Sequence, residues 1–221
     1  MKERDFLAGP DDLPADLDRA AHIHNEFVRG CRTLHGLGPA VTVFGSARFG
    51  EDHRYYRLAR DTGRALAEAG FAVITGGGPG IMEAANRGAQ EGGGISVGCT
   101  ITLPHEQVTN PYLDRTIEFD YFFVRKVMLM KYSRSFICMP GGVGTLDEIF
   151  EAGTLIQTGK IPPFPIIVMG TEFWQPLRDF IRGRMFGEGT IDEGEVTPTY
   201  TDVPAEAVAH LRAAYPDVAG A

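Results

Sequence analysis

The sequence lacks the long apolar runs, basic surface charge and cysteine pairs that would mark several large classes of protein. It has no stretch of about 18 apolar residues, so we expect no membrane span. Lysine and arginine total 21 against 29 aspartates and glutamates, and the net charge of −8 argues against DNA or RNA binding. The three cysteines (Cys31, Cys99 and Cys138) are odd in number and far apart, which favours a reducing, cytoplasmic location. The acidic, polar first residues do not resemble a secretory signal.

Several catalytic patterns are also missing. The six histidines are scattered without an H-E-x-x-H motif or a Cys/His cluster, so we predict no metal site. There is no G-x-S-x-G nucleophile elbow. The lysine of a nucleotide-binding P-loop is also missing, since Gly144-Thr145 is followed by Leu146. The glycine-rich segment 76–80 fits the dinucleotide fingerprint poorly, because Ile81 stands where the third glycine would fall. Hydride transfer and nucleoside triphosphate hydrolysis are therefore disfavoured, and we predict no cofactor.

From Pro39 onward the sequence alternates short apolar runs with helical patterns. Strands are expected over residues 40–44, 71–75, 95–101, 116–123, 136–139 and 165–169, and helices over 53–69, 81–91, 124–134, 145–158, 173–185 and 204–214. This alternation predicts an α/β fold, a Rossmann-like doubly wound parallel sheet flanked by helices on both faces.

The first 38 residues stand apart from this pattern. We expect residues 22–34 to form a helix and residues 11–17, which are rich in Asp and Pro, to be irregular. The predicted organisation is thus an N-terminal extension over residues 1–38 and a single Rossmann-like nucleotide-binding domain over residues 39–221.

Three glycine-containing turns follow expected strands. They are Gly45-Ser46, the segment 76–80 and the segment 140–145. In sheets of this kind ligands bind outside the carboxyl ends of the strands. Glycine lets the backbone approach a ligand, and a helix start offers free N–H groups and a positive dipole end to an anion. One such turn is more often a tight connection, but three at one edge favour a phosphate or nucleotide site.

Glu148, in the first turn of an expected helix, has two interpretations. Thr145 and Glu148 have the T-x-x-E spacing of a capping box, in which the glutamate only closes the helix start. The preceding Pro-Gly-Gly turn favours the other interpretation, in which Thr145 and nearby amides hold a phosphate and Glu148 faces the attached group. Arg125 and Lys126 open the preceding helix, where cations oppose the dipole. We therefore expect either a salt bridge or a ligand to use this pair.

The segment Pro140-Gly141-Gly142-Val143-Gly144-Thr145-Leu146-Asp147-Glu148 resembles the P-G-G-x-G-T-x-x-E signature of the LOG ("lonely guy") family. Arg125-Lys126 lies upstream at that family's spacing, and the other two glycine turns also match. The resemblance covers residues 39–190. Members cleave cytokinin riboside monophosphates and often AMP, and many carry an old lysine decarboxylase label. The first 38 residues resemble the longer bacterial branch.

The resemblance implies roles for numbered residues. Arg125 and Glu148 would be catalytic, with Glu148 acting at the ribose C1′ and Arg125 orienting ribose and carboxylate. The substrate-binding positions would be Gly45, Ser46, Gly77, Gly78, Glu106, Lys126, Gly141, Gly142, Val143, Gly144, Thr145 and Thr154, with residues 142–145 on the 5′-phosphate. The family is dimeric, so a homodimer in which a neighbouring subunit helps to complete the site is expected. Glu83 stands where plant-type members have glycine, which leaves the substrate preference open.

The expected reaction is hydrolysis of an N-glycosidic bond. Such reactions pass through an oxocarbenium-like state, which a nearby carboxylate stabilises while it activates water. The sequence thus predicts a phosphoribohydrolase that releases a free purine base and ribose 5-phosphate from a nucleoside 5′-monophosphate. The alternative is a non-catalytic nucleotide or cofactor carrier, such as the molybdenum-cofactor carrier, which has a similar fold. Decarboxylation with pyridoxal phosphate is disfavoured, because only Lys126 of the four lysines lies near the expected site.

Overall fold

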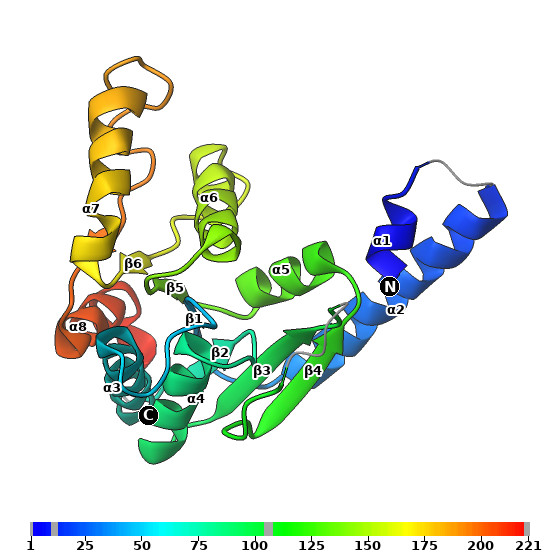
Figure 1. The fold of residues 1–221 in the computed structure, drawn as a ribbon, viewed down its shortest axis with the longest axis horizontal. Coiled ribbons are helices and arrows are strands. Elements are labelled where there is room, and N and C mark those ends of the chain that lie inside the picture. The colour runs from blue at the N-terminus through cyan, green and yellow to red at the C-terminus, as the bar shows by residue number, and fades with distance from the viewer. Residues whose placement is uncertain (1, 10–12, 104–107, 219–221) are drawn as a thin grey trace.

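The computed structural model describes residues 2–9, 13–103 and 108–218. Its strands form one parallel sheet in the order β4-β3-β2-β1-β5-β6-β7 (Figure 1). The strands are β1 (Ala40–Phe44), β2 (Ala72–Thr75), β3 (Ser96–Ile101), β4 (Arg115–Phe119), β5 (Ser135–Cys138), β6 (Ile166–Val168) and β7 (Thr199–Tyr200). The chain runs outward from β1 to β4 and then returns to place β5 beside β1. This reversal is the point at which doubly wound sheets bind ligands.

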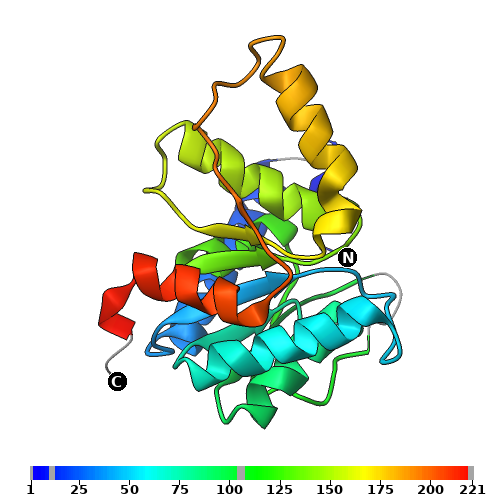
Figure 2. The same ribbon diagram turned by 90° about the vertical axis from the view of Figure 1, so that its left-hand side faces the viewer.

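Helices cover both faces of the sheet, as predicted. They are α1 (Lys2–Phe6), α2 (Leu13–Leu34), α3 (Arg54–Glu68), α4 (Ile81–Glu91), α5 (Phe122–Lys131), α6 (Val143–Gln157), α7 (Thr171–Phe180), the π-helix η1 (Ile181–Met185), α8 (Pro204–Ala214) and the short 3₁₀ helix η2 (Pro216–Val218). Figure 2 shows α3 and α8 lying across one face.

Alternation along the strands explains why both faces are covered. In β1, Val41 and Val43 face a core formed with α3, α4 and α8, whereas Ala40 and Phe44 face a second core formed with α2, α5, α6 and α7. Successive side chains of a strand point to opposite faces. All five residues of β1 are buried, so this strand is covered on both sides, and the predicted α/β fold class is confirmed.

The differences from the expected elements have local causes. Of residues 11–17, which were expected to be irregular, 11 and 12 lie outside the described residues, and 13–17 begin α2, because Pro14 falls in the first helical turn, where its missing N–H is tolerated. The fourth strand ends at Phe119 rather than 123, and α5 begins at Phe122. The strand β7 was missed because it has only two residues, too few to show a period. Within the described residues, no helix has both the length and the apolar character to cross a membrane.

Candidate active site

The three glycine turns meet at the carboxyl edge of the sheet. The Ser46 amide donates to the Pro140 carbonyl at 3.0 Å, and the Ser46 carbonyl accepts from the Ile81 amide at 3.0 Å. A Cβ at Gly45 would lie 2.5 Å from Ile81 Cγ2, and one at Gly80 would lie 2.4 Å from the Ser46 carbonyl oxygen. These contacts leave no room for a side chain, so glycine is what lets the turns touch.

Two buried asparagines hold the middle turn in place. Asn110 donates from its backbone amide to the Gly77 carbonyl (2.9 Å) and from Nδ2 to the Gly78 carbonyl (3.0 Å). Thr75 Oγ1 accepts from the Gly77 amide at 2.9 Å and donates to Asn86 Oδ1 at 2.5 Å. The backbone of Gly77 and Gly78 is therefore held in place by hydrogen bonds to neighbouring residues. Sequence reasoning missed both asparagines, since they lie 24 residues apart and outside any motif.

The third turn leads directly into α6, with Gly142 as its N-cap. Val143 and Gly144 follow as the first two helical residues, and both are exposed. Their amides have no acceptor within the helix because they belong to its first turn. This start of α6 can therefore accept an anion from solvent.

The capping-box interpretation of Glu148 is wrong. Since Gly142 is the N-cap, Thr145 is the third helical residue and Glu148 the sixth, one turn further in than expected. Thr145 is buried beside Gly141, the first glycine of the turn. A Cβ at Gly141 would lie 2.2 Å from Thr145 Oγ1 and 3.2 Å from the Ser46 amide nitrogen. The lack of a side chain at Gly141 thus brings the Thr145 hydroxyl and the Ser46 turn together.

Glu148 is a buried carboxyl group with an unsatisfied oxygen. The residue is 3% exposed, and among the described residues Oε2 has no hydrogen-bond partner. Burial raises the pKa of Glu148 to about 7, against the opposing charges of Arg125 and Lys126. A carboxyl that titrates near neutrality in a site of this kind is typical of acid–base chemistry.

Arg125 is the charged residue opposite this carboxyl. It is the fourth residue of α5, so the basic pair does not open its helix as predicted. Its guanidinium carbon lies 5.0 Å from the centroid of the Phe122 ring, and its Nε has no partner in the described part of the chain. A Cβ at Gly76 would lie 3.7 Å from Arg125 Nη1, so the guanidinium reaches the middle glycine turn. Burial lowers the pKa of Arg125, and Glu148 opposes this effect.

Of the two uses expected for Arg125 and Lys126, a salt bridge or a ligand, Lys126 makes salt bridges. Its Nζ lies 2.9 Å from Asp147 Oδ1 and 2.6 Å from Glu151 Oε2, which ties α5 to α6. Burial acts to lower the pKa of Lys126, but the hydrogen bonds to Glu151 and Asp147 outweigh it and the pKa is raised. Lys126 thus joins the two helices that carry Arg125 and Glu148.

Two glutamates of the N-terminal helices cap α5. Glu26 of α2 is buried and accepts from the amides of residues 120 and 121 at 2.8 and 3.4 Å. Glu3 of α1 accepts from the Phe122 amide at 3.1 Å. Carboxylates at a helix start satisfy its free N–H groups and complement its dipole. Residues before the expected domain therefore position the helix that carries Arg125.

Two positions singled out in the sequence, Thr154 and Glu83, lie away from the buried carboxyl. Glu106 falls outside the described residues. Thr154 lies six residues beyond Glu148 on a different face of α6, and its hydroxyl donates to the Phe150 carbonyl at 2.8 Å. Its contact with substrate stays a prediction. Glu83 accepts from the Tyr56 hydroxyl at 2.8 Å, so it serves the packing of α4 on α3.

Two further observations bound the chemistry. A cavity of about 180 Å³ lies beside Gly77 at the end of β3, with Thr100 and Glu118 among its lining residues. In the described ranges, no group of three or more His, Cys, Asp or Glu residues is arranged to hold a metal ion. The arrangement thus offers an anion cradle, a cation and a near-neutral carboxyl at one sheet edge.

Comparison with known proteins gives a consistent result. A family model described as "Possible lysine decarboxylase" matches residues 82–211, more than half of the chain. The cytokinin riboside 5′-monophosphate phosphoribohydrolase of Rhodococcoides fascians is 30% identical over 163 residues, which cover 72% of this chain and 79% of that protein. The Mycobacterium tuberculosis protein of the same name is 34% identical over 144 residues, covering 64% and 74%.

Solved structures share the fold. The X-ray structure of TM1055 has a TM-score of 0.61 and 28% identity, covering 79% of this chain and 99% of that one. A molybdenum-cofactor-binding protein from Rippkaea orientalis has a TM-score of 0.59 at 19% identity, covering 80% and 96%, which shows a common fold alone. The family match, the named relatives and the P-G-G-x-G-T-x-x-E turn, with its half-buried arginine and buried glutamate, agree, and the chain belongs to the LOG family.

Proposed function

We propose that the chain hydrolyses the N-glycosidic bond of purine nucleoside 5′-monophosphates. The substrates would be AMP, N6-substituted cytokinin riboside monophosphates, or both, and the products a free base and ribose 5-phosphate. The observation that carries this proposal is Glu148, a buried carboxyl with an unpartnered oxygen beside Arg125 and the start of α6. The names of the two bacterial relatives support the substrate class.

The 5′-phosphate would bind at the exposed start of α6. The free amides of Val143 and Gly144, the positive end of the helix dipole and the Thr145 hydroxyl all suit an anion there. Binding the phosphate away from the reacting bond supplies positioning energy for the sugar. The ribose would then lie between this cradle and Arg125.

Glu148 would act at C1′ in its ionised form. As the bond from C1′ to the base nitrogen breaks with its electron pair leaving on the base, positive charge develops on the sugar, and the carboxylate stabilises it. Water adds its oxygen to C1′ and gives one proton to Glu148, and a proton from solution neutralises the base. Arg125 orients ribose and carboxylate, and its charge favours the ionised form of Glu148.

We also propose that the protein forms a homodimer through α5 and the start of α6. Apolar side chains next to the site are exposed in the single chain: Phe122, Phe123, Val127 and Val143. A second copy that covers them would exclude water from the reacting bond. Light scattering after size exclusion should give twice the chain mass. Val127→Glu should give a monomer, and Val203→Glu, on the α8 side, should not; a monomeric wild type would contradict the dimer.

The reaction is tested by chromatography of AMP and N6-isopentenyl-AMP after incubation with purified protein. We expect adenine or N6-isopentenyladenine together with ribose 5-phosphate from the wild type and not from Glu148→Gln. The carrier alternative predicts that both nucleotides are recovered intact, even when equilibrium dialysis shows that one of them is bound. Base release at the wild-type rate by Glu148→Gln would overturn the assigned role of the glutamate.

A further inference from the structure

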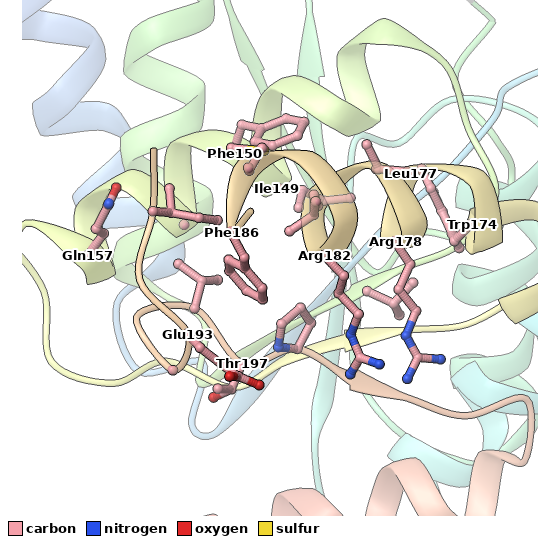
Figure 3. A pocket seen from close by; sticks show the side chains of 18 of the residues that line it. Ile149, Phe150, Gln157, Trp174, Leu177, Arg178, Arg182, Phe186, Glu193 and Thr197 are labelled. Atoms are coloured by element: carbon pink, nitrogen blue, oxygen red, sulfur yellow. The ribbon is translucent and has the colours of Figure 1, made fainter. Parts of the chain in front are cut away.

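A second cavity lies on the face of α6 that points away from Glu148. It has a volume of about 300 Å³ and lies between α6, the α7–η1 helix and residues 191–200 (Figure 3). Its walls are mostly apolar, and the large side chains among them are Ile149, Phe150, Trp174, Leu177, Ile181, Met185 and Phe186. Small-molecule sites are typically concave and apolar and begin at about this volume.

A glycine in the middle of α6 keeps this cavity open. Gly153 lines it, although glycine in a helix interior costs about 1 kcal/mol relative to alanine. A Cβ at this position would meet only the Val196 side chain, at 3.7 and 3.8 Å, which is ordinary contact. Neither packing nor backbone conformation therefore requires glycine here. A larger residue at position 153 would instead fill part of the cavity.

Two arginines stand at one end of the cavity without a carboxylate partner. Arg178 and Arg182 are one helical turn apart, and Figure 3 shows both guanidinium groups pointing the same way. No ion pair within the described residues involves either one, and Arg178 Nε is buried without a hydrogen-bond acceptor. The Arg178 guanidinium lies 4.5 Å from the centroid of the Tyr200 ring. The adjacent Arg184, by contrast, pairs with Glu188.

Tyr200 lies near both arginines. Burial raises the pKa of its hydroxyl, and the charges of both Arg178 and Arg182 oppose that rise. Both guanidinium groups therefore lie within electrostatic range of the same hydroxyl. Arg182 belongs to the π-helix η1, a distortion found frequently at functional sites.

We propose that this cavity binds a small amphipathic anion, with its carboxylate or phosphate head on Arg178 and Arg182 and its aliphatic or aromatic body against α6. Arginine presents a planar fork that matches such oxyanions, and the partly buried guanidinium of Arg178, which has no partner at Nε, gains most from one, while the exposed Arg182 adds a second positive charge. Each methylene that such a body buries against the apolar lining contributes about 0.8 kcal/mol to binding. Thr154, the substrate contact expected from the family resemblance, also lines this cavity, so the test below is carried out without a nucleotide.

The test uses the full chain and 8-anilinonaphthalene-1-sulfonate, an aromatic anion that fluoresces when bound in apolar surroundings. We expect saturable binding that decanoate displaces and decanol does not. The double variant Arg178→Met/Arg182→Met should weaken binding at least tenfold, and Gly153→Leu should abolish it by filling the cavity. Arg184→Met is the matched control, because it removes a neighbouring arginine that does not line the cavity.

Circular dichroism establishes that each variant is folded, and a second filling variant, Gly153→Val, replaces the first if it is not. Equal binding by wild type and folded double variant would overturn the proposal, as would displacement by decanol as effective as by decanoate. A change of oligomeric mass in Gly153→Leu would show that a second copy occupies the cavity and would also overturn it. Because the probe is read without AMP, failure of the hydrolase proposal leaves this test unaffected.

Discussion

Two glutamates of this protein, Glu91 and Glu148, lie near arginines but differ in burial, in hydrogen bonding and in pKa. Glu91, at the end of α4, accepts hydrogen bonds from three arginines at 2.5 to 3.2 Å on the outer surface: Arg60, Arg64 and Arg87. These bonds, that from Arg60 foremost, lower the pKa of Glu91 to about 2. Glu148 is buried and has an oxygen without a partner, and burial raises its pKa to about 7.

This difference in hydrogen bonding and pKa distinguishes a carboxylate with a structural role from one that is available for catalysis. At Glu91 the protein supplies all the partners, so nothing remains for a ligand to satisfy. At Glu148 the protein provides charges nearby and leaves the oxygen open, which is costly unless a bound molecule uses it. An arginine close to a glutamate is therefore not informative by itself, whereas an unsatisfied buried carboxylate is.

The largest expected effect comes from breaking Glu148. Glu148→Gln keeps the shape and removes the charge, so base release from AMP should fall by about 10²- to 10⁴-fold, the usual contribution of an acid–base group. The matched substitution Glu91→Gln should leave the rate unchanged. Steady-state rates of adenine release measure both, and equal losses in the two variants would remove the distinction between them.

The pH dependence of stability should have opposite slopes at the two glutamates. The folded pKa of Glu148 lies above the ordinary 4.5, so its contribution is complete below pH 4.5 and is lost as pH rises to about 7. The loss is on the order of 3 kcal/mol. The folded pKa of Glu91 lies below 4.5, so its contribution is present above pH 4.5 and is lost as pH falls towards 2.

Urea unfolding of wild type, Glu148→Gln and Glu91→Gln across pH 3–8 checks these slopes. The stability difference between wild type and Glu148→Gln should move against the wild type between pH 4.5 and 7. The difference from Glu91→Gln should move against the wild type only below pH 4.5. Parallel profiles for all three proteins would mean that the two carboxyl groups titrate alike.

A smaller effect is expected when the support of Arg125 is loosened. Glu26→Ala removes the buried acceptor of two amides before α5, which should cost about 1–3 kcal/mol of stability. Because α5 carries Arg125, kcat for AMP should also fall. Restoration of kcat by Glu26→Gln, which keeps an acceptor, would identify positioning as the cause, while an unchanged kcat in folded Glu26→Ala would exclude it.

The smallest effect should come from the surface network itself. Glu91→Gln weakens charge-assisted bonds that lie in contact with solvent, so we expect a loss of about 1 kcal/mol or less at pH 7. Raising the salt concentration to 1 M should reduce the difference further, since exposed ion pairs are screened. Thermal unfolding at low and high salt measures this, and a loss above 3 kcal/mol would show that the network is not superficial.

Much of the fold could be predicted from local sequence. β1, α4 and α8 have the expected bounds, and the three glycine turns lie at one edge as inferred, because each depends on patterns a few residues long. The parallel sheet was predicted from the alternation of strands and helices, whereas the order of its strands, with β5 beside β1, was not predicted. The P-G-G-x-G-T-x-x-E segment also marked the helix start that could hold an anion.

The remainder depends on contacts between distant parts of the chain. The start of α5 is set by Glu26 and Glu3, which lie 94 and 119 residues away from the amides that they bind. Asn86 of α4 and Asn110 of a loop, which hold the middle glycine turn, are hydrogen-bonded to each other, and no local sequence pattern predicts this contact. Thr145 and Glu148 would form a capping box only if Thr145 were the N-cap of α6. The T-x-x-E spacing alone does not fix the N-cap, which is Gly142 in the structure.

The most direct test of the account is the pH dependence of kcat/KM for adenine release from AMP by the wild-type protein. Since Glu148 must be ionised to act, kcat/KM should rise with pH through a pKa near 7, and Glu91→Gln should show the same profile. Base release that is flat between pH 5 and 9, or that rises through a pKa near 4.5, would contradict the claim that a buried, unsatisfied glutamate performs the reaction.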